Sequence, residues 1–143
     1  MSVEQILAGK GTDVVTIEPD RTLADAANCL AQRRIGAVVV VDGSGAVQGI
    51  ISERDVVRAV SEAGAEALSA PVSSRMTSEV VTCLPTSSID EIMGLMTKGK
   101  FRHIPVLDGG RLAGIVSIGD VVKQRLADIE SEHQALRNYI ATA

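Results

Sequence analysis

Two short stretches of the sequence place a serine and an aspartate three residues apart, directly after an apolar run. The stretches GIISERDVV and GIVSIGDVV contain Ser52 with Asp55 and Ser117 with Asp120. One interpretation is structural, because Ser-x-x-Asp is a capping box that satisfies free N–H groups at a helix start. The other is a nucleotide site, because a helix start attracts phosphate and a carboxylate accepts hydrogen bonds from ribose hydroxyls. Spacing alone leaves both interpretations open.

Cationic side chains near these stretches favour a phosphate ligand. Arg54 lies within the first stretch, and Arg102 and His103 open an apolar run in the second half of the chain. Guanidinium groups form strong, charge-assisted hydrogen bonds with phosphate oxygens. We expect these residues to supply local positive charge in a chain whose net charge is −4.

Both stretches end copies of one longer pattern. Residues 14–57 align with residues 80–122 with a gap of one residue, and the copies share Val-Val-Thr, a proline, Asp-Gly and the Gly-apolar-apolar-Ser ending. Such self-similarity indicates a repeated structural unit. Each copy predicts a short strand, at residues 14–17 or 80–83, which a following proline ends.

The rest of each copy predicts a helix, a hairpin and a second helix. Thr22 with Asp25 and Ser88 with Glu91 mark helix starts, and apolar residues at helical spacing follow them. Apolar runs on either side of an Asp-Gly turn then predict hairpins, at residues 37–41 with 47–51 and 103–107 with 112–116. Continuous apolar runs indicate strands covered on both faces. The predicted fold is therefore α/β (α+β), with two β-α-β-β-α units packed sheet to sheet as one module.

This pattern divides the chain into four parts. We expect the first repeat, with a short N-terminal helix, at residues 3–60, a linker at 61–75, the second repeat at 76–126 and an amphipathic C-terminal helix at 127–143. An apolar stripe recurs at heptad spacing through the last helix, at Val122, Leu126, Ile129, His133, Leu136 and Ile140. The stripe predicts a homodimer, with folding back onto its own module as the alternative. Protonation of His133 near about pH 6 is expected to loosen the contact.

Composition argues against several classes of function. A net charge of −4 and only two aromatic residues, Phe101 and Tyr139, are unlike a nucleic-acid binder, which needs a basic face and stacking rings. No apolar run has the length of a membrane span. No Cys or His grouping has metal-ligand spacing, so Cys29 and Cys83 are expected to be core thiols in a cytoplasmic protein.

Motifs typical of enzymes are also missing. Neither the dinucleotide pattern G-x-G-x-x-G nor a P-loop occurs in the sequence. The histidines, His103 and His133, have no serine or cysteine partner in a recognisable catalytic order. We therefore expect a binding protein and not an enzyme.

With these motifs in place, the chain resembles the tandem cystathionine β-synthase (CBS) domain family, whose paired repeats are called a Bateman module. The resemblance covers about residues 3–126 and is strongest in the second copy, through its Met-Thr start, Arg-His-Ile-Pro-Val, Asp-Gly and Gly-Ile-Val-Ser-x-x-Asp. It implies a standalone regulatory module that binds an adenosine-containing ligand, here AMP or NAD, with ATP or ADP as further possibilities, and no metal. The first copy departs from the pattern at Gly36-Ala37, where the second has Arg102-His103.

The resemblance also implies two ligand clefts, each shared between the repeats. One would use Thr12, Val14, Gly36, Ala37, Ser117 and Asp120, with Arg102 and His103 near phosphate. The other would use Ser52, Arg54, Asp55, Val80, Phe101 and Arg102. A bound nucleotide would then signal to a target protein. The rival hypothesis is a dimeric, non-catalytic scaffold protein whose clefts are empty or incidental.

Overall fold

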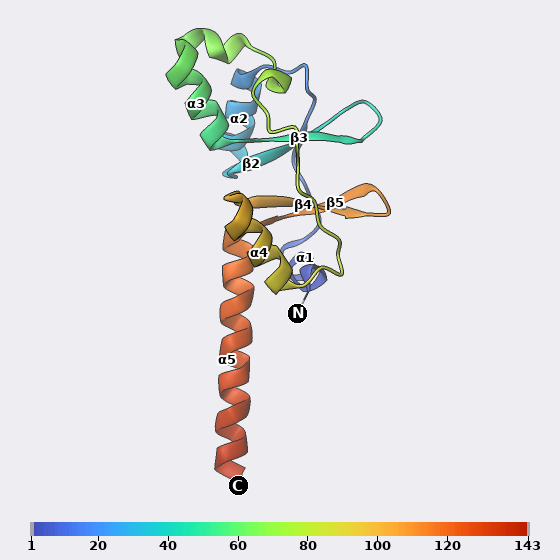
Figure 1. The fold of residues 1–143 in the computed structure, drawn as a ribbon, viewed down its shortest axis with the longest axis vertical. Helices are drawn as coiled ribbons and strands as arrows, with labels where there is room; N and C mark the ends of the chain where they lie inside the picture. The colour runs from blue at the N-terminus through green and yellow to red at the C-terminus, as the bar shows by residue number, and fades with distance from the viewer. Residues whose placement is uncertain (1, 143) are drawn as a thin grey trace.

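The two sequence copies fold as two lobes whose hairpins lie side by side (Figure 1). The computed structural model describes residues 2–142. The first lobe contains β1 (Thr16–Ile17), α2 (Leu23–Arg33), β2 (Ala37–Val41), β3 (Val47–Ser52) and α3 (Glu53–Ala63). The second contains α4 (Ile89–Gly99), β4 (His103–Asp108), β5 (Arg111–Ser117) and α5 (Ile118–Thr142). The predicted mixed α/β fold is confirmed.

The first lobe packs two helices against a three-stranded sheet. β2 pairs in parallel with β1 and antiparallel with β3. The capping box predicted at the start of α2 is present, because Thr22 Oγ1 accepts from Asp25 N–H at 3.1 Å and Asp25 Oδ2 accepts from Thr22 N–H at 3.2 Å. Helix and sheet meet in a core to which Cys29 also contributes, built on Leu23, Leu30, Val38, Val40 and Ile51.

In the second lobe, the strand predicted at residues 80–83 does not form. Cys83 makes an isolated bridge to β4, donating to Pro105 O at 3.0 Å and accepting from Leu107 N–H at 2.9 Å. The next bond of a parallel ladder needs an N–H at residue 105, and proline has none. The strand prediction was wrong because it ignored this missing donor. Cys83 is a core thiol as predicted, and burial raises its pKa to about 11.

The N-terminal helix α1 (Val3–Lys10) packs on the second lobe, although the sequence placed it with the first repeat. Val3, Ile6 and Leu7 are buried in the second core. At Gly114 of β5, an added Cβ would lie 2.6 Å from Leu7 Cδ2, so this glycine permits the close approach of α1. The chain then crosses from α1 to the first lobe (Figure 1).

Residues 61–75, expected to be a linker, connect the repeats but are largely helical. They contain the end of α3 and the 3₁₀ helices η1 (Gly64–Ser69) and η2 (Val72–Ser74). Val72 is fully buried in the first core. Just beyond, Thr77 exchanges two backbone hydrogen bonds with Ile50 of β3, at 2.9 and 3.0 Å. Each lobe is therefore completed by chain from outside its own strand-helix-hairpin unit.

Most of α5 extends away from both lobes (Figure 1). The apolar stripe is exposed along it, with 49% of Ile129 and 66% of Ile140 accessible. Folding back of the stripe onto its own module, the alternative considered from the sequence, is thus not observed. Within residues 2–142, no helix combines the length and the apolar character needed to cross a membrane.

A side chain at Gly49 is expected to destabilise the first lobe. Its Cβ would lie 2.6 Å from Thr77 O, so the paired backbone of that segment must move. We expect Gly49→Ala to lower the free energy of unfolding by about 1–3 kcal/mol, the usual cost of overpacking. Gly43→Ala is the matched control, because nothing lies within 4 Å of the added atom. Urea unfolding measures both, and equal stability of the two variants would contradict the described packing.

Candidate functional site

A cleft with a volume of about 680 Å³ lies between the two lobes. The start of α3 and the start of β2 line it from the first lobe, and the turn between α4 and β4 lines it from the second. Nine residues predicted from the sequence lie on its walls: Gly36, Ala37, Ser52, Arg54, Asp55, Val80, Phe101, Arg102 and His103. The structure thus brings together every residue predicted for the cleft of Ser52 and Asp55.

The start of α3 is held at the edge of the cleft by hydrogen bonds on both sides. Asp55 Oδ2 accepts from Ser52 N–H at 2.9 Å and from Ser52 Oγ at 3.0 Å, and Asp55 N–H donates to Ser52 Oγ at 3.3 Å. Glu53 N–H donates to Gly36 O at 3.0 Å, which fixes the helix start against the entry to β2. The capping interpretation is therefore confirmed. It places a carboxylate and a helix N-terminus on the cleft wall together.

Charges of both signs line the cleft. Arg54, Arg58, Lys100 and Arg102 contribute four cationic groups, and Glu53, Asp55 and Glu79 contribute carboxylates. Sequence reasoning missed Arg58, although it lies one helical turn after Arg54 and spacing of four residues places both on one helix face. Lys100 follows the last residue of α4 in a left-handed conformation, with φ of 56°. No sequence motif predicts its place in the cleft. The positive groups suit an anionic ligand.

An apolar wall completes the cleft. Val80, Val81 and Phe101 line it together with Val57, whose side chain is 68% exposed. The Phe101 ring lies against Gly99, where an added Cβ would have no room. A flat aromatic ligand group finds apolar contact here, while its polar parts reach the charged residues at the helix start.

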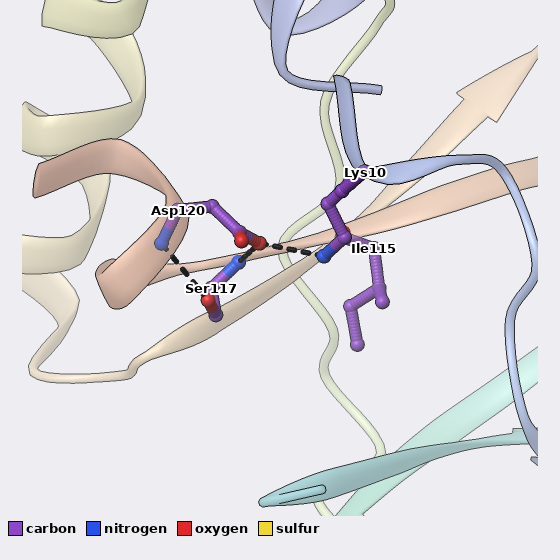
Figure 2. A network of polar contacts seen from close by, with 4 residues as sticks. All are labelled: Lys10, Ile115, Ser117 and Asp120. Atoms are coloured by element: carbon purple, nitrogen blue, oxygen red, sulfur yellow. Dashed lines mark hydrogen bonds and ion pairs between the residues drawn. The ribbon is translucent and has the colours of Figure 1, made fainter. Parts of the chain in front are cut away.

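The second predicted pair, Ser117 and Asp120, caps the start of α5 but has a different neighbour (Figure 2). Asp120 Oδ2 accepts from Ser117 N–H at 2.9 Å and from Lys10 Nζ at 2.6 Å. Burial alone would raise the pKa of Asp120, but the hydrogen bonds from Lys10 and Ser117 hold it below its ordinary value. Nothing in the sequence motifs pointed to Lys10, because it lies in another element far from this pair along the chain.

A smaller hollow of about 200 Å³ lies beside Asp120 and is lined by Lys10 and Lys123, among others. The other residues predicted for this second site do not line the hollow beside Asp120. Thr12 and Val14 do not line the 680 Å³ cleft either, whereas Gly36 and Ala37 line it with Asp55. The grouping of Gly36 and Ala37 with Ser117 and Asp120 stays a prediction. Within residues 2–142, no cluster of three or more His, Cys, Asp or Glu side chains is arranged to hold a metal ion.

His103 joins the two lobes. An added Cβ at Gly36 would lie 3.2 Å from both Cε1 and Nε2 of the imidazole, so the ring packs directly over that glycine. Burial is the main cause that lowers the pKa of His103, and the charge of Lys10 lowers it further, while Asp120 opposes this. The ring therefore favours its neutral form at the interface.

The chain belongs to the CBS domain family. The family model for the CBS domain matches it twice, at residues 3–62 and 72–127. The CBS domain-containing protein YhcV of Bacillus subtilis is 32% identical over 127 residues, which cover 89% of each chain. The resemblance drawn from the sequence motifs is confirmed.

Solved structures of this family superpose on most of the chain. The CBS-domain containing protein ATU1752 from Agrobacterium tumefaciens is 52% identical, with a TM-score of 0.85, and the match covers 87% of this chain and 99% of that one. The CBS domain protein PAE2072 from Pyrobaculum aerophilum, solved as a complex with AMP, is 26% identical, with a TM-score of 0.76. That match covers 84% of this chain and 89% of PAE2072.

Acid is expected to destabilise the lobe interface through His103. Since its pKa in the folded protein lies below the ordinary 6.5, the unfolded chain binds the proton first as pH falls. The stability contributed by the neutral ring is therefore present above about pH 7 and is lost as pH falls through 6.5 toward the folded pKa. We expect His103→Gln to reduce the fall in melting temperature between about pH 7.5 and 5.5. Thermal unfolding at both pH values measures this, and a loss of the pH dependence in His133→Gln instead would contradict it.

Proposed function

We propose that the 680 Å³ cleft binds an adenosine nucleotide, AMP or NAD in the first instance and ATP or ADP as alternatives. One observation carries the proposal: a capped helix start, cationic side chains and an apolar wall meet in one cleft between the lobes. Its volume falls in the range of about 300–1,000 Å³ that is usual for small-molecule sites. The AMP complex of PAE2072 supports the same ligand class.

Each part of a nucleotide has a matching group in this cleft. We assign the base to the apolar wall of Val80 and Phe101, and the ribose hydroxyls to the Asp55 carboxylate. The phosphate is assigned to Arg54 and Arg102, assisted by the N-terminus of α3. Glu79 and Glu53 also line the cleft and disfavour a highly charged phosphate chain, which supports AMP or NAD over ATP.

The biological role that fits such a module is regulatory and not catalytic. Binding at the junction of two lobes changes the contacts between them, and a target protein that recognises this change receives the signal. The proposal includes a cytoplasmic location, an unidentified target protein and a homodimer. It includes neither a nucleic acid nor a membrane as a partner.

Substitution of Asp55 tests the proposed ribose contact, and substitution of Asp25 provides a matched control. Asp25 makes the same capping box at the start of α2 but does not line the cleft. We expect Asp55→Asn to weaken AMP binding at least about tenfold, because a hydrogen bond to a charged group contributes roughly 1.5–3 kcal/mol. Asp25→Asn is expected to bind AMP like the unmodified protein.

Isothermal titration calorimetry with AMP, together with thermal unfolding, separates binding from capping. Weak binding in Asp55→Asn alone supports the ribose role. Unchanged AMP affinity in a destabilised Asp55→Asn protein would show that this aspartate is a cap and nothing more. Absence of binding by the unmodified protein at millimolar AMP would favour the scaffold hypothesis.

The homodimer proposal is supported by the exposed stripe on α5. Leu126, Ile129, Leu136 and Ile140 are each about half or more exposed and recur at heptad spacing, which is the pattern of a helix pair. Isolated apolar residues are common on surfaces, but a continuous stripe of this length marks an interaction site.

Charge placed on the stripe is expected to separate the dimer. We expect the double variant Ile129→Glu with Leu136→Glu to be a monomer at micromolar concentration, because two buried glutamates per helix would lack partners. Ser131→Glu adds charge to the same exposed helix outside the stripe and is expected to remain a dimer. Light scattering after gel filtration measures the mass. An unmodified protein that is already monomeric would refute the proposal.

A further inference from the structure

Lys10 makes the two Ser-x-x-Asp pairs unequal. Its ammonium donates to Asp120 Oδ2 at 2.6 Å and to Ile115 O at 2.8 Å, and the Lys10 and Asp120 side chains are only 33% and 23% exposed (Figure 2). In the first copy, both hydrogen bonds to Asp55 Oδ2 come from its capping serine, through Ser52 N–H and Oγ, whereas Asp120 Oδ2 accepts one from Ser117 N–H and one from Lys10. The two aspartates are therefore equivalent in sequence and cap but not in their charged neighbours.

The position of Lys10 is set by the packing of α1 and is not that of a free surface side chain. Val3, Ile6 and Leu7 anchor the helix in the second core, and Gly114 lets Leu7 approach β5 closely. Lys10 is the last residue of this helix, and it lies over Ile115, the next residue of β5. The packed helix fixes the backbone at Lys10, so only the side-chain rotamers remain to be ordered when the hydrogen bonds form.

The contact pairs the Asp120 carboxylate with a fixed positive charge. Each aspartate accepts two hydrogen bonds at Oδ2, but one of the two donors at Asp120 is the Lys10 ammonium, whereas both donors at Asp55 are neutral groups of Ser52. A ribose hydroxyl would have to displace the Lys10 ammonium, which would leave both members of a partly buried ion pair without their opposite charge. The hollow of about 200 Å³ beside Asp120 is lined by α1 and α5, so on this side Asp120 faces α1.

We infer that Lys10 blocks Asp120 as a ribose-binding position, so that each chain binds one nucleotide, in the cleft of Asp55. The inference rests on the proposed function, because it assumes that these Ser-x-x-Asp pairs are ribose-binding positions when nothing occupies them. The inference gives α1, which lies outside the repeated pattern, a role in ligand binding. Through Lys10, α1 makes the two repeats of the module unequal, so that only one of two similar positions binds a ligand.

Removing the ammonium tests this with AMP as the probe in isothermal titration calorimetry. We expect one AMP per chain for the unmodified protein and two for Lys10→Met, which keeps the apolar stem of the side chain. Lys123→Met is the matched control, since Lys123 lines the same hollow and is exposed, and it is expected to bind one. The double variant Lys10→Met with Asp120→Asn is expected to return to one. If the melting temperature of Lys10→Met is lowered, Lys10→Gln provides a second test of the same loss of charge.

The outcomes separate the inference from the proposed function. One AMP per chain in both the unmodified protein and Lys10→Met, or two in both, would overturn the inference and leave the Asp55 cleft standing. Weaker binding in Lys10→Met would also overturn it, because Lys10 would then be a ligand contact. No binding by the unmodified protein with one site in Lys10→Met would support the block and refute the Asp55 cleft. No binding by either protein would refute both.

Discussion

The burial of α1 against the opposite repeat is the contact on which the rest of the arrangement depends. Val3, Ile6 and Leu7 are at most 7% exposed in the second core, and burying side chains of this kind contributes roughly 1.5–3 kcal/mol each. Because α1 packs on the second lobe, the chain must cross to reach β1 in the first. A second crossing, after η2, returns the chain through Thr77, which pairs with β3. The lobes are held side by side by these two crossings, and the cleft lies between them.

The same packing gives the two Ser-x-x-Asp pairs different surroundings. Each copy ends in a strand that passes into a capped helix, so the local geometry repeats. The surroundings differ, because α1 carries Lys10 to Asp120 while the cleft beside Asp55 stays open. Capping and ligand binding are thus not rival explanations of Ser-x-x-Asp. The cap sets the position of the carboxylate, and the neighbouring elements determine whether a ligand can reach it.

Much of the fold follows from local patterns in the sequence. The helix starts at Thr22 and Ser52, both hairpins and the repeat itself are all predictable, because caps, Asp-Gly turns and apolar periodicity depend on neighbours along the chain. The missing strand at 80–83 depends instead on Pro105 in a different strand, so only knowledge of the partner reveals it. The packing of α1 on the second lobe has the same character, since its apolar face fits either core.

The candidate site was predictable to a similar extent. Ser52, Arg54, Asp55 and Phe101 were found through motifs, and spacing along α3 also points to Arg58. The contact of Lys10 with Asp120 was not predictable, because it results from the packing of α1 on the second lobe. Motifs therefore identify candidate residues that line the cleft, whereas the choice between two similar positions requires the tertiary structure.

The most direct test of the central claim is a crystal structure of the protein grown with AMP. The account predicts one nucleotide in the cleft between the lobes, with its ribose hydroxyls on Asp55, its base against Val80 and Phe101, and its phosphate near Arg54 and Arg102. AMP bound at Asp120 in place of Lys10, or an empty cleft at saturating AMP, would contradict the account.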